Sequence, residues 1–223
     1  MRTIFGLFAD PWDTEARPRV SRRASLDRTA EGGCPHIRST GQPGRLSLHE
    51  HMSALNEGFR LPAAVLLDNV RSMYNVGAFF RAADGAGLQR LCLCGITAHP
   101  GLGLRSKKAI SKTALGAEET VAWEDDWDAV RMAEGLRGDG FEIAAIETNL
   151  EAVDLFNWQP TFPVCVMFGH EVDGLRPELL AMADTHVRIP MMGQKKSLNV
   201  ATAGGIVLYE LLRKYRALRV DRR

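Results

Sequence analysis

Short apolar runs alternate with longer segments of helical periodicity from residue 63 to the end of the chain. In the longer segments, apolar side chains recur every three or four positions, which is typical of a helix with one buried face. The short runs are rich in branched residues and predict strands. The expected strands are 63–67, 89–94, 119–123, 141–146, 164–168 and 185–189, and the expected helices are 75–86, 127–137, 176–183 and 199–218. Residues 101–112 predict a loop or a short helix.

Several of the expected strands are apolar on both faces, as in the run Val164-Cys-Val-Met-Phe168. A strand of this kind must be covered on two sides, and strands that alternate with helices pair in parallel. We therefore expect an α/β fold, with a parallel sheet covered by helices on both faces. Such sheets bind ligands at the carboxyl ends of their strands, so we expect a site in the segments that follow the strands.

Residues 1–60 have a different composition. Between residues 17 and 45 there are seven arginines against Asp27 and Glu31, with much Gly, Pro and Ser and little periodicity. This predicts a basic, partly flexible N-terminal arm, with a possible short helix at 47–56, ahead of a catalytic domain at 61–223. The arm suits RNA phosphates, and it equally suits a solvated tail.

The bulk properties narrow the class of protein. The net charge is +1 over 223 residues, so attraction to nucleic acid must come from local patches. No apolar run is long enough to span a membrane, and the N-terminus is unlike a signal peptide, which indicates a cytoplasmic protein without a membrane partner. Cys92 and Cys94 share one face of a strand and read as reduced core thiols, and no metal-binding spacing is present.

Two glycine-containing segments resemble nucleotide-binding motifs only superficially. Asp84-Gly-Ala-Gly87 closes a helix where a dinucleotide-binding turn would open one, so Gly87 is expected just past a helix end. The stretch from Gly193 to Ser197 lacks the earlier glycine of a phosphate-binding loop, because Arg188 stands there.

Three further segments, each beginning after an expected strand, carry polar residues in a distinctive order. They are Asn75-Val-Gly-Ala-Phe-Phe-Arg81, Phe168-Gly-His-Glu-Val-Asp-Gly174, and Ile189-Pro-Met-Met-Gly-Gln-Lys-Lys-Ser-Leu-Asn-Val200. Together they resemble the three signatures of the SpoU family of RNA ribose methyltransferases, of the SPOUT class, over about residues 64–216. His170 and Val172 depart from that family, which more often has Asn and Gly at these positions.

The resemblance implies a C-terminal deep trefoil knot, S-adenosyl-L-methionine as cofactor, and a ribose 2′-OH of tRNA or rRNA as methyl acceptor. It also implies a homodimer, because the family builds its site at a subunit interface. Cofactor-binding residues carried over from the family are Gly169, Ile189, Pro190, Met191 and Leu198. Catalytic residues carried over are Arg81, Asn75, Glu171, Ser197 and Asn199.

The roles implied for these residues differ in how well chemistry supports them. The family assigns proton acceptance to the arginine matched by Arg81, but a guanidinium stays protonated in proteins, so holding RNA phosphate is the easier task. Asn75 would orient Arg81 or the RNA, and Glu171 would hold Arg81 or Asn199 or shape the cofactor loop. Ser197 and Asn199 would bind phosphate or the cofactor carboxylate. Lysines 107, 108 and 112 would lie on the RNA side, with a solvated face as the alternative.

Two other functions remain compatible with the sequence. A base methyltransferase of the same class would share the knot, although the Asn75-to-Arg81 signature indicates ribose. An RNA-binding module without catalysis would not need the cofactor signature.

Overall fold

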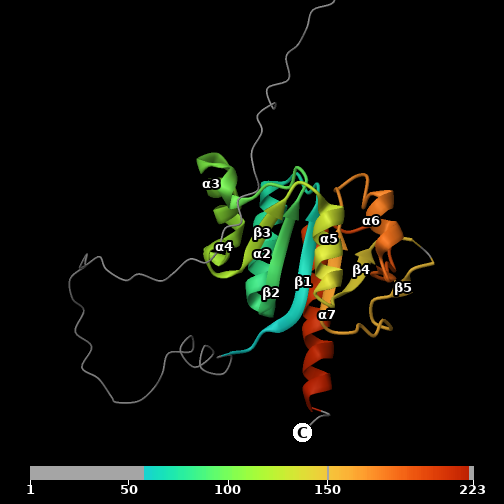
Figure 1. Cartoon of the computed structure of the whole chain (residues 1–223). Helices are drawn as coiled ribbons and strands as arrows, with labels where there is room; N and C mark the ends of the chain where they lie inside the picture. Colours follow the sequence, from blue (N-terminus) through green and yellow to red (C-terminus); the bar gives the residue numbers. More distant parts are fainter. Residues whose placement is uncertain (1–57, 150, 221–223) are drawn as a thin grey trace, which may run out of the picture.

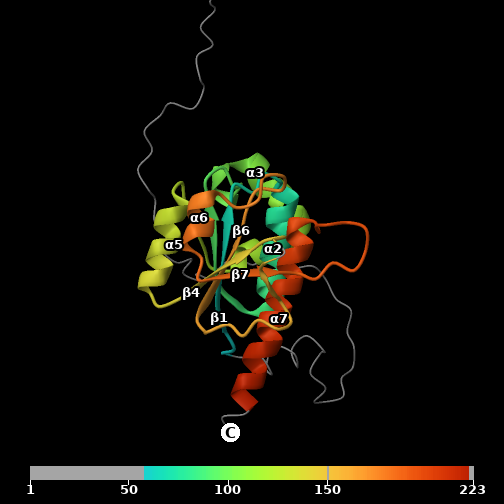
Figure 2. The ribbon, with the colours of Figure 1, turned by 90° about the vertical axis from the view of Figure 1, so that its right-hand side faces the viewer.

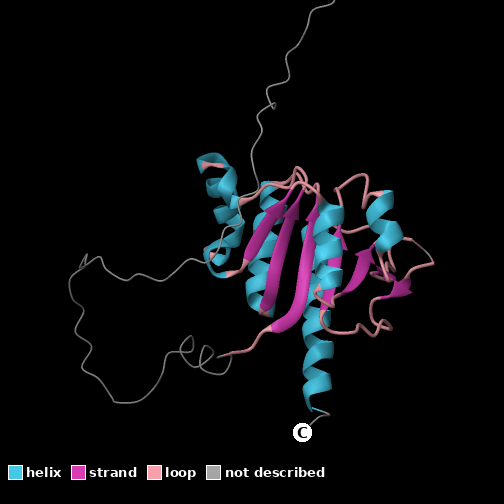
Figure 3. Cartoon of the chain, in the orientation of Figure 1, coloured by secondary structure: helices cyan, strands magenta, loops and turns pink. Residues whose placement is uncertain are grey.

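The computed structural model describes residues 58–149 and 151–220. Its centre is a parallel sheet with the strand order β3-β2-β1-β6-β4-β7-β5 (Figure 1). The strands are β1 (Leu61–Asp68), β2 (Leu88–Cys94), β3 (Trp123–Asp126), β4 (Glu142–Ile146), β5 (Val153–Asp154), β6 (Val164–Phe168) and β7 (Thr185–Arg188). Their arrowheads point to the same edge of the sheet (Figure 3), so the expected parallel α/β fold is confirmed.

Helices cover both faces of this sheet. The helices are α2 (Met73–Ala86), η1 (Pro100–Leu102), α3 (Leu104–Ala114), α4 (Ala117–Thr120), α5 (Ala129–Gly138), α6 (Pro177–Met182) and α7 (Val200–Val220). Figure 2 shows α2 and α7 on one side of the sheet and α5 and α6 on the other. None of the helices within the described residues is both long and apolar enough to cross a membrane.

The central strand β1 shows why both faces need a cover. Ala63, Val65 and Leu67 pack into the core under α2 and α7, whereas Ala64 and Leu66 pack into the core under α5 and α6. All five side chains are fully buried. A strand that is apolar on both faces is unstable in contact with water. β1 therefore lies in the sheet layer between two layers of helices.

The ends of α2 follow from its capping residues. Ser72 is the N-cap, and its hydroxyl accepts a hydrogen bond from the backbone N–H of Asn75 at 3.3 Å. Gly87 ends the helix in the left-handed conformation at φ 67°, with its N–H directed to Ala83 and Asp84 carbonyls. The prediction that Gly87 lies just past a helix end is confirmed, and the helix begins two residues earlier than residue 75.

The prediction of a strand at 119–123 is wrong. Residues Ala117–Thr120 form the short helix α4, and the strand β3 begins only at Trp123. β3 is an edge strand of acidic residues, so its sequence lacks the apolar alternation by which strands are recognised. The segment 101–112 falls mostly in α3, a full helix, and the short edge strand β5 was not expected. Most of the predicted arm, residues 1–57, lies outside the described residues.

The cysteines of the sheet are free and buried, as expected. Cys92, Cys94 and Cys165 lie under α5 and α6. Burial raises the pKa of Cys165 to about 12 and raises the pKa values of the other two thiols as well. These thiols stay protonated near neutral pH and serve as core side chains.

Replacing either of two adjacent glycines of α7 by alanine should have opposite effects on stability. A Cβ at Gly204 would meet the Phe79 ring at 2.1 Å, whereas a Cβ at Gly205 would meet no atom within 4 Å. We expect Gly204→Ala to lower the free energy of unfolding by roughly 1–3 kcal/mol through overpacking. Gly205→Ala should raise it by about 1 kcal/mol through helix propensity. Urea denaturation of both variants checks this, and a destabilised Gly205→Ala would contradict it.

Candidate active site

A cavity of about 380 Å³ opens at the edge of the sheet where the strands end. Its walls come from the segments after β4, β6 and β7, and from the first turn of α7. Small-molecule sites typically measure about 300–1,000 Å³, so the cavity can hold one cofactor-sized ligand. Gly169, Ile189, Met191 and Leu198 line it, as do Glu171, Ser197 and Asn199. Pro190 lies between two lining residues without being one itself.

The loop after β6, residues 169–176, is closed on itself by backbone contacts. His170 and Gly174 exchange two N–H to carbonyl hydrogen bonds, each 3.0 Å long. A Cβ at Gly169 would lie 2.1 Å from the Gly174 carbonyl carbon and 2.3 Å from the backbone nitrogen of Leu175. Gly174 itself has φ 72°, the left-handed region that favours glycine. Only glycine fits at position 169, and the backbone of the loop therefore forms one wall of the cavity.

One hydrogen-bonded chain joins the three signature segments. The Asn75 side-chain amide donates to a Glu171 carboxylate oxygen at 3.1 Å. The Asn199 side-chain amide donates to the Asn75 side-chain oxygen at 3.2 Å. The oxygen of Asn199 in turn accepts hydrogen bonds from the N–H groups of Ala201 and Thr202, at 3.0 and 3.2 Å, which caps α7. The segments that follow β1, β6 and β7 are thus joined by hydrogen bonds.

Glu171 also accepts hydrogen bonds from the backbone of the loop after β1. The N–H of Ser72 lies 3.1 Å from one carboxylate oxygen, and the N–H of Arg71 lies 3.3 Å from the other. Burial by itself would raise the pKa of Glu171, but these donors and Asn75 outweigh it and hold the pKa below its ordinary value. Glu171 is therefore ionised at neutral pH, and its hydrogen bonds connect the loop after β6 to the loop after β1.

This lowered pKa predicts a pH-dependent contribution of Glu171 to stability. The carboxylate stabilises the folded chain above the unfolded pKa of about 4.3, and the contribution is lost as the pH falls through the lower folded value. We expect Glu171→Gln to destabilise the protein by a constant amount near neutral pH and by a shrinking amount in acid. Urea denaturation of both proteins between about pH 3 and pH 7 measures this difference. A difference that does not change with pH would contradict it.

Arg81 lies apart from the other predicted catalytic residues. It is six positions after Asn75 on α2, which corresponds to about 9 Å along the axis and about 240° around it. Its exposed side chain lines a second, open hollow of about 660 Å³ together with Lys112, Thr113 and Tyr209. Asn75 was expected to orient Arg81 or the RNA; within one chain, its side chain binds Glu171 and Asn199.

The predicted lysine run lies on α3, which packs tightly against α2. A Cβ at Gly77 of α2 would meet the Thr113 hydroxyl at 2.1 Å and the Ile110 carbonyl oxygen at 2.4 Å, so the two helices touch along their backbones. Lys107 pairs with Glu119 at 3.0 Å, whereas Lys108 and Lys112 are exposed, and Lys112 reaches the Arg81 hollow. The positive charges of α2 and α3 therefore form one surface.

Several residues near the cavity were not predicted from the sequence. Glu147, at the end of β4, accepts the backbone N–H of Leu175 at 3.0 Å. Asp68, at the end of β1, binds Arg176. Lys196 lines the cavity beside Ser197. An acidic residue at the end of an apolar strand was the available signal for Asp68 and Glu147, because such a residue lies at the edge where parallel strands place their sites.

Residues 62–209 match the SpoU rRNA Methylase family. The chain belongs to this family. The resemblance of the three signature segments is thereby confirmed.

Two curated relatives show how far the similarity of this SpoU family member extends. The 23S rRNA (guanosine-2′-O-)-methyltransferase RlmB of Shewanella oneidensis is 34% identical over 200 residues, which cover 89% of this chain and 79% of that enzyme. The tRNA (guanosine(18)-2′-O)-methyltransferase of Escherichia coli strain K12 is 31% identical over 150 residues, 67% of this chain. The match spans only 62% of the length of the Escherichia coli enzyme.

A solved structure supports the same assignment for the fold. The AdoMet-bound rRNA methyltransferase of Sinorhizobium meliloti superposes with a TM-score of 0.62 at 29% identity, covering 70% of this chain and 57% of that one. The parallel sheet and its flanking helices are thus those of SpoU methyltransferases.

Proposed function

We propose that this SpoU family protein transfers a methyl group from S-adenosyl-L-methionine to a ribose 2′-OH of structured RNA, either tRNA or rRNA. The observation that carries the proposal is the chain of hydrogen bonds from Glu171 through Asn75 to Asn199, which joins all three signatures beside one cavity. A protein that only bound RNA would not need a cofactor-sized cavity at this place.

The residues around the cavity fit a cofactor with an adenine ring and an amino-acid tail. Ile189, Met191 and Leu198 offer apolar walls, and the turn of Gly169 exposes backbone groups that can hydrogen-bond the edge of a base. Lys196 supplies a positive charge at the rim. Pro190 fixes the backbone between Ile189 and Met191. When bound, the cofactor supplies an activated methyl group. The cavity residues hold the cofactor in place.

On the RNA side, Arg81 and Lys112 hold phosphate, and Arg81 orients the 2′-OH through its two-pronged geometry. Ser197 and Asn199 lie at the cavity, where they can bind the ribose or its phosphate. Orientation of two reactants lowers the activation barrier by roughly 7–11 kcal/mol in the ideal case. The 2′-OH proton leaves as the new C–O bond forms, and solvent water or an RNA phosphate oxygen accepts it, so no proton transfer is assigned to Glu171.

The separation of Arg81 from the cavity supports a homodimer. In one copy, Arg81 faces the hollow beside Tyr209. A second copy that places its cavity at this hollow would complete the site with Arg81 from across the interface. The exposed side chain of Tyr209, 53% accessible, supplies apolar surface for such a contact.

The dimer predicts that Tyr209→Glu weakens self-association. A buried unpaired charge at the interface is costly, so sedimentation velocity should show a shift from dimer to monomer. Cofactor affinity should persist while methyl transfer falls. A monomeric wild-type protein with full activity would contradict the shared site.

The family also supports a trefoil knot in the C-terminal part, a division into an arm at 1–60 and a catalytic domain at 61–223, and a place in the cytoplasm, where tRNA and rRNA are modified. The described domain is in keeping with the division, because its first strand, β1, begins at Leu61.

Direct tests can distinguish this function from its alternatives. Calorimetry should detect binding of S-adenosyl-L-methionine without metal or nucleotide, and labelled methyl should appear in tRNA or rRNA. The modified nucleotide should resist alkaline cleavage, because a methylated 2′-oxygen cannot attack the neighbouring phosphate. An alkali-labile product would indicate base methylation, and RNA binding without cofactor binding or methyl transfer would indicate an RNA-binding module.

A further inference from the structure

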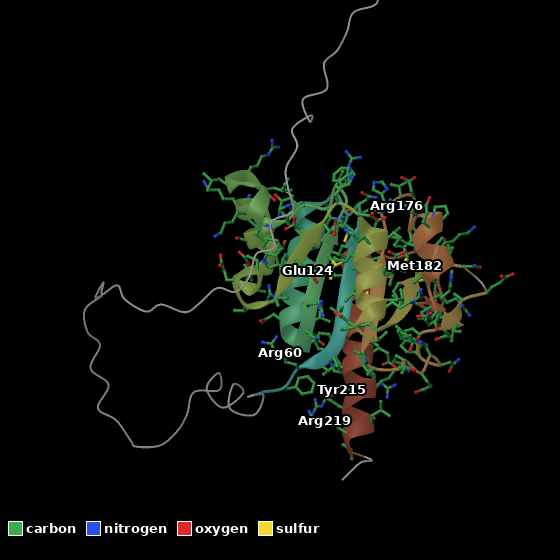
Figure 4. All side chains as sticks on the ribbon, in the orientation of Figure 1. Arg60, Glu124, Arg176, Met182, Tyr215 and Arg219 are labelled. Carbon is green, nitrogen blue, oxygen red and sulfur yellow. The ribbon has the colours of Figure 1, made fainter. Side chains whose placement is uncertain are left out.

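An ion pair with a buried carboxylate lies just outside the cavity. Asp68 ends β1 with its side chain 1% exposed, and Arg176 precedes α6 with its side chain 42% exposed. The Arg176 guanidinium donates to both carboxylate oxygens, at 2.9 and 3.1 Å. Figure 4 shows Arg176 at the edge where the strands end, at the opposite end of the domain from Arg60 and Arg219. Neither partner of the pair lines the cavity.

The pair belongs to a two-point connection between the loop 169–176 and the segment 68–75. At one point, the Arg176 side chain reaches back to Asp68. At the other, the Glu171 side chain of the loop receives the N–H groups of Arg71 and Ser72. A single connection would let the loop rotate about it, whereas two connections several residues apart fix both its position and its tilt.

The loop that is fixed in this way forms a wall of the cavity. His170, Glu171, Val172 and Gly174 line it, and the backbone of Gly169 turns directly against Gly174. A shift of the loop would therefore change the cavity itself. We propose that Arg176, acting through Asp68, is a positioning residue that sets the cofactor affinity of the loop 169–176.

Burial of the Asp68 carboxylate gives this pair a larger effect than the exposed ion pairs of the surface. A buried carboxylate must be paired and hydrogen-bonded, and bidentate arginine pairs combine charge with fixed geometry. Arg137 offers a matched comparison, because it binds Asp184 at 2.7 Å and is as exposed as Arg176, but its partner Asp184 is 46% exposed where Asp68 is buried. It lies at the end of α5, and neither it nor Asp184 lines the cavity. Both arginines join a helix end to an aspartate, yet only Arg176 is connected to the cavity loop.

The test compares Arg176→Met with Arg137→Met in the full-length protein. Calorimetric titration with S-adenosyl-L-methionine should show affinity about tenfold weaker for Arg176→Met and unchanged for Arg137→Met. Arg176→Lys should recover part of the loss, since it keeps the charge without the two-pronged geometry. The double variant Asp68→Asn with Arg176→Met leaves no buried unpaired charge, so it separates loss of positioning from loss of stability.

Hydrogen exchange supplies a readout that does not depend on the proposed function. Amides of residues 170–175 should exchange faster in Arg176→Met, while amides of β1 and β6 keep their protection. If the wild-type protein bound no S-adenosyl-L-methionine, the proposed function would fail, and the exchange result would still decide the positioning role. Equal affinities for wild type and Arg176→Met, or unchanged exchange in the loop, would overturn the inference.

Discussion

Arg81→Ala is expected to lower the rate of methyl transfer by at least about 10²-fold, the cost of misplacing a reacting group by about 1 Å. Cofactor affinity should stay unchanged, because Arg81 lines the hollow beside Tyr209 and not the cavity of Gly169 and Leu198. Arg81→Lys should remain severely impaired, since lysine keeps the charge and loses the planar fork. Single-turnover assays with labelled cofactor, together with calorimetry, measure the two effects separately.

Arg60→Ala is the matched control for this prediction. Arg60 is also an exposed arginine, but it lies at the beginning of β1, at the far end of the sheet from the cavity. Its removal should leave the transfer rate near that of the wild type. If Arg81→Ala retained near wild-type activity, the mechanism of phosphate holding would have to be abandoned.

Gly169→Ala is expected to abolish cofactor binding. Its Cβ would stand 2.1–2.3 Å from backbone atoms of Gly174 and Leu175. Backbone atoms cannot move aside by a change of rotamer, as a side chain can. The loop must therefore open, which breaks the His170–Gly174 hydrogen bonds and displaces a wall of the cavity. Calorimetry with S-adenosyl-L-methionine should show no measurable binding, while circular dichroism should show that the sheet persists.

The control for this substitution is Gly193→Ala, in the loop that follows β7. A Cβ there would meet no atom within 4 Å, so the variant should bind cofactor as the wild type does. A Gly169→Ala variant that bound normally would show that the loop can accommodate a side chain, and its backbone would then not form the wall described above.

The sequence predicted the sheet better than it predicted the site. Strands buried on both faces, such as β6, are recognisable because their apolar runs are continuous. The C-terminal end of α2 was predicted because a glycine determines it, at Gly87. The edge strand β3 escaped prediction because its exposed position allows the acidic run Glu124 to Asp126.

The grouping of site residues could not be obtained from sequence spacing alone. The first signature contains both Asn75 and Arg81, but Asn75 binds Glu171 and Asn199 beside the cavity, whereas Arg81 lines the separate hollow beside Tyr209. The partners of Glu171 are backbone N–H groups of Arg71 and Ser72, which no side-chain pattern reveals. The pairing of Asp68 with Arg176 depends on how two distant loops meet at the end of the sheet.

The hydrogen bonds that join the three signatures also connect the site to folding kinetics. Asn75 and Asn199 are separated by 124 positions, and Arg71 and Glu171 by 100. Contacts of such long range form late, because the chain must close large loops before they are made. The cavity therefore exists only in the fully folded chain, and a ligand at a hundred times its Kd would stabilise that state by about 2.7 kcal/mol. We expect proteolysis of the protein in the cell to slow as the concentration of the proposed cofactor rises, so that the cofactor would also set the lifetime of the protein.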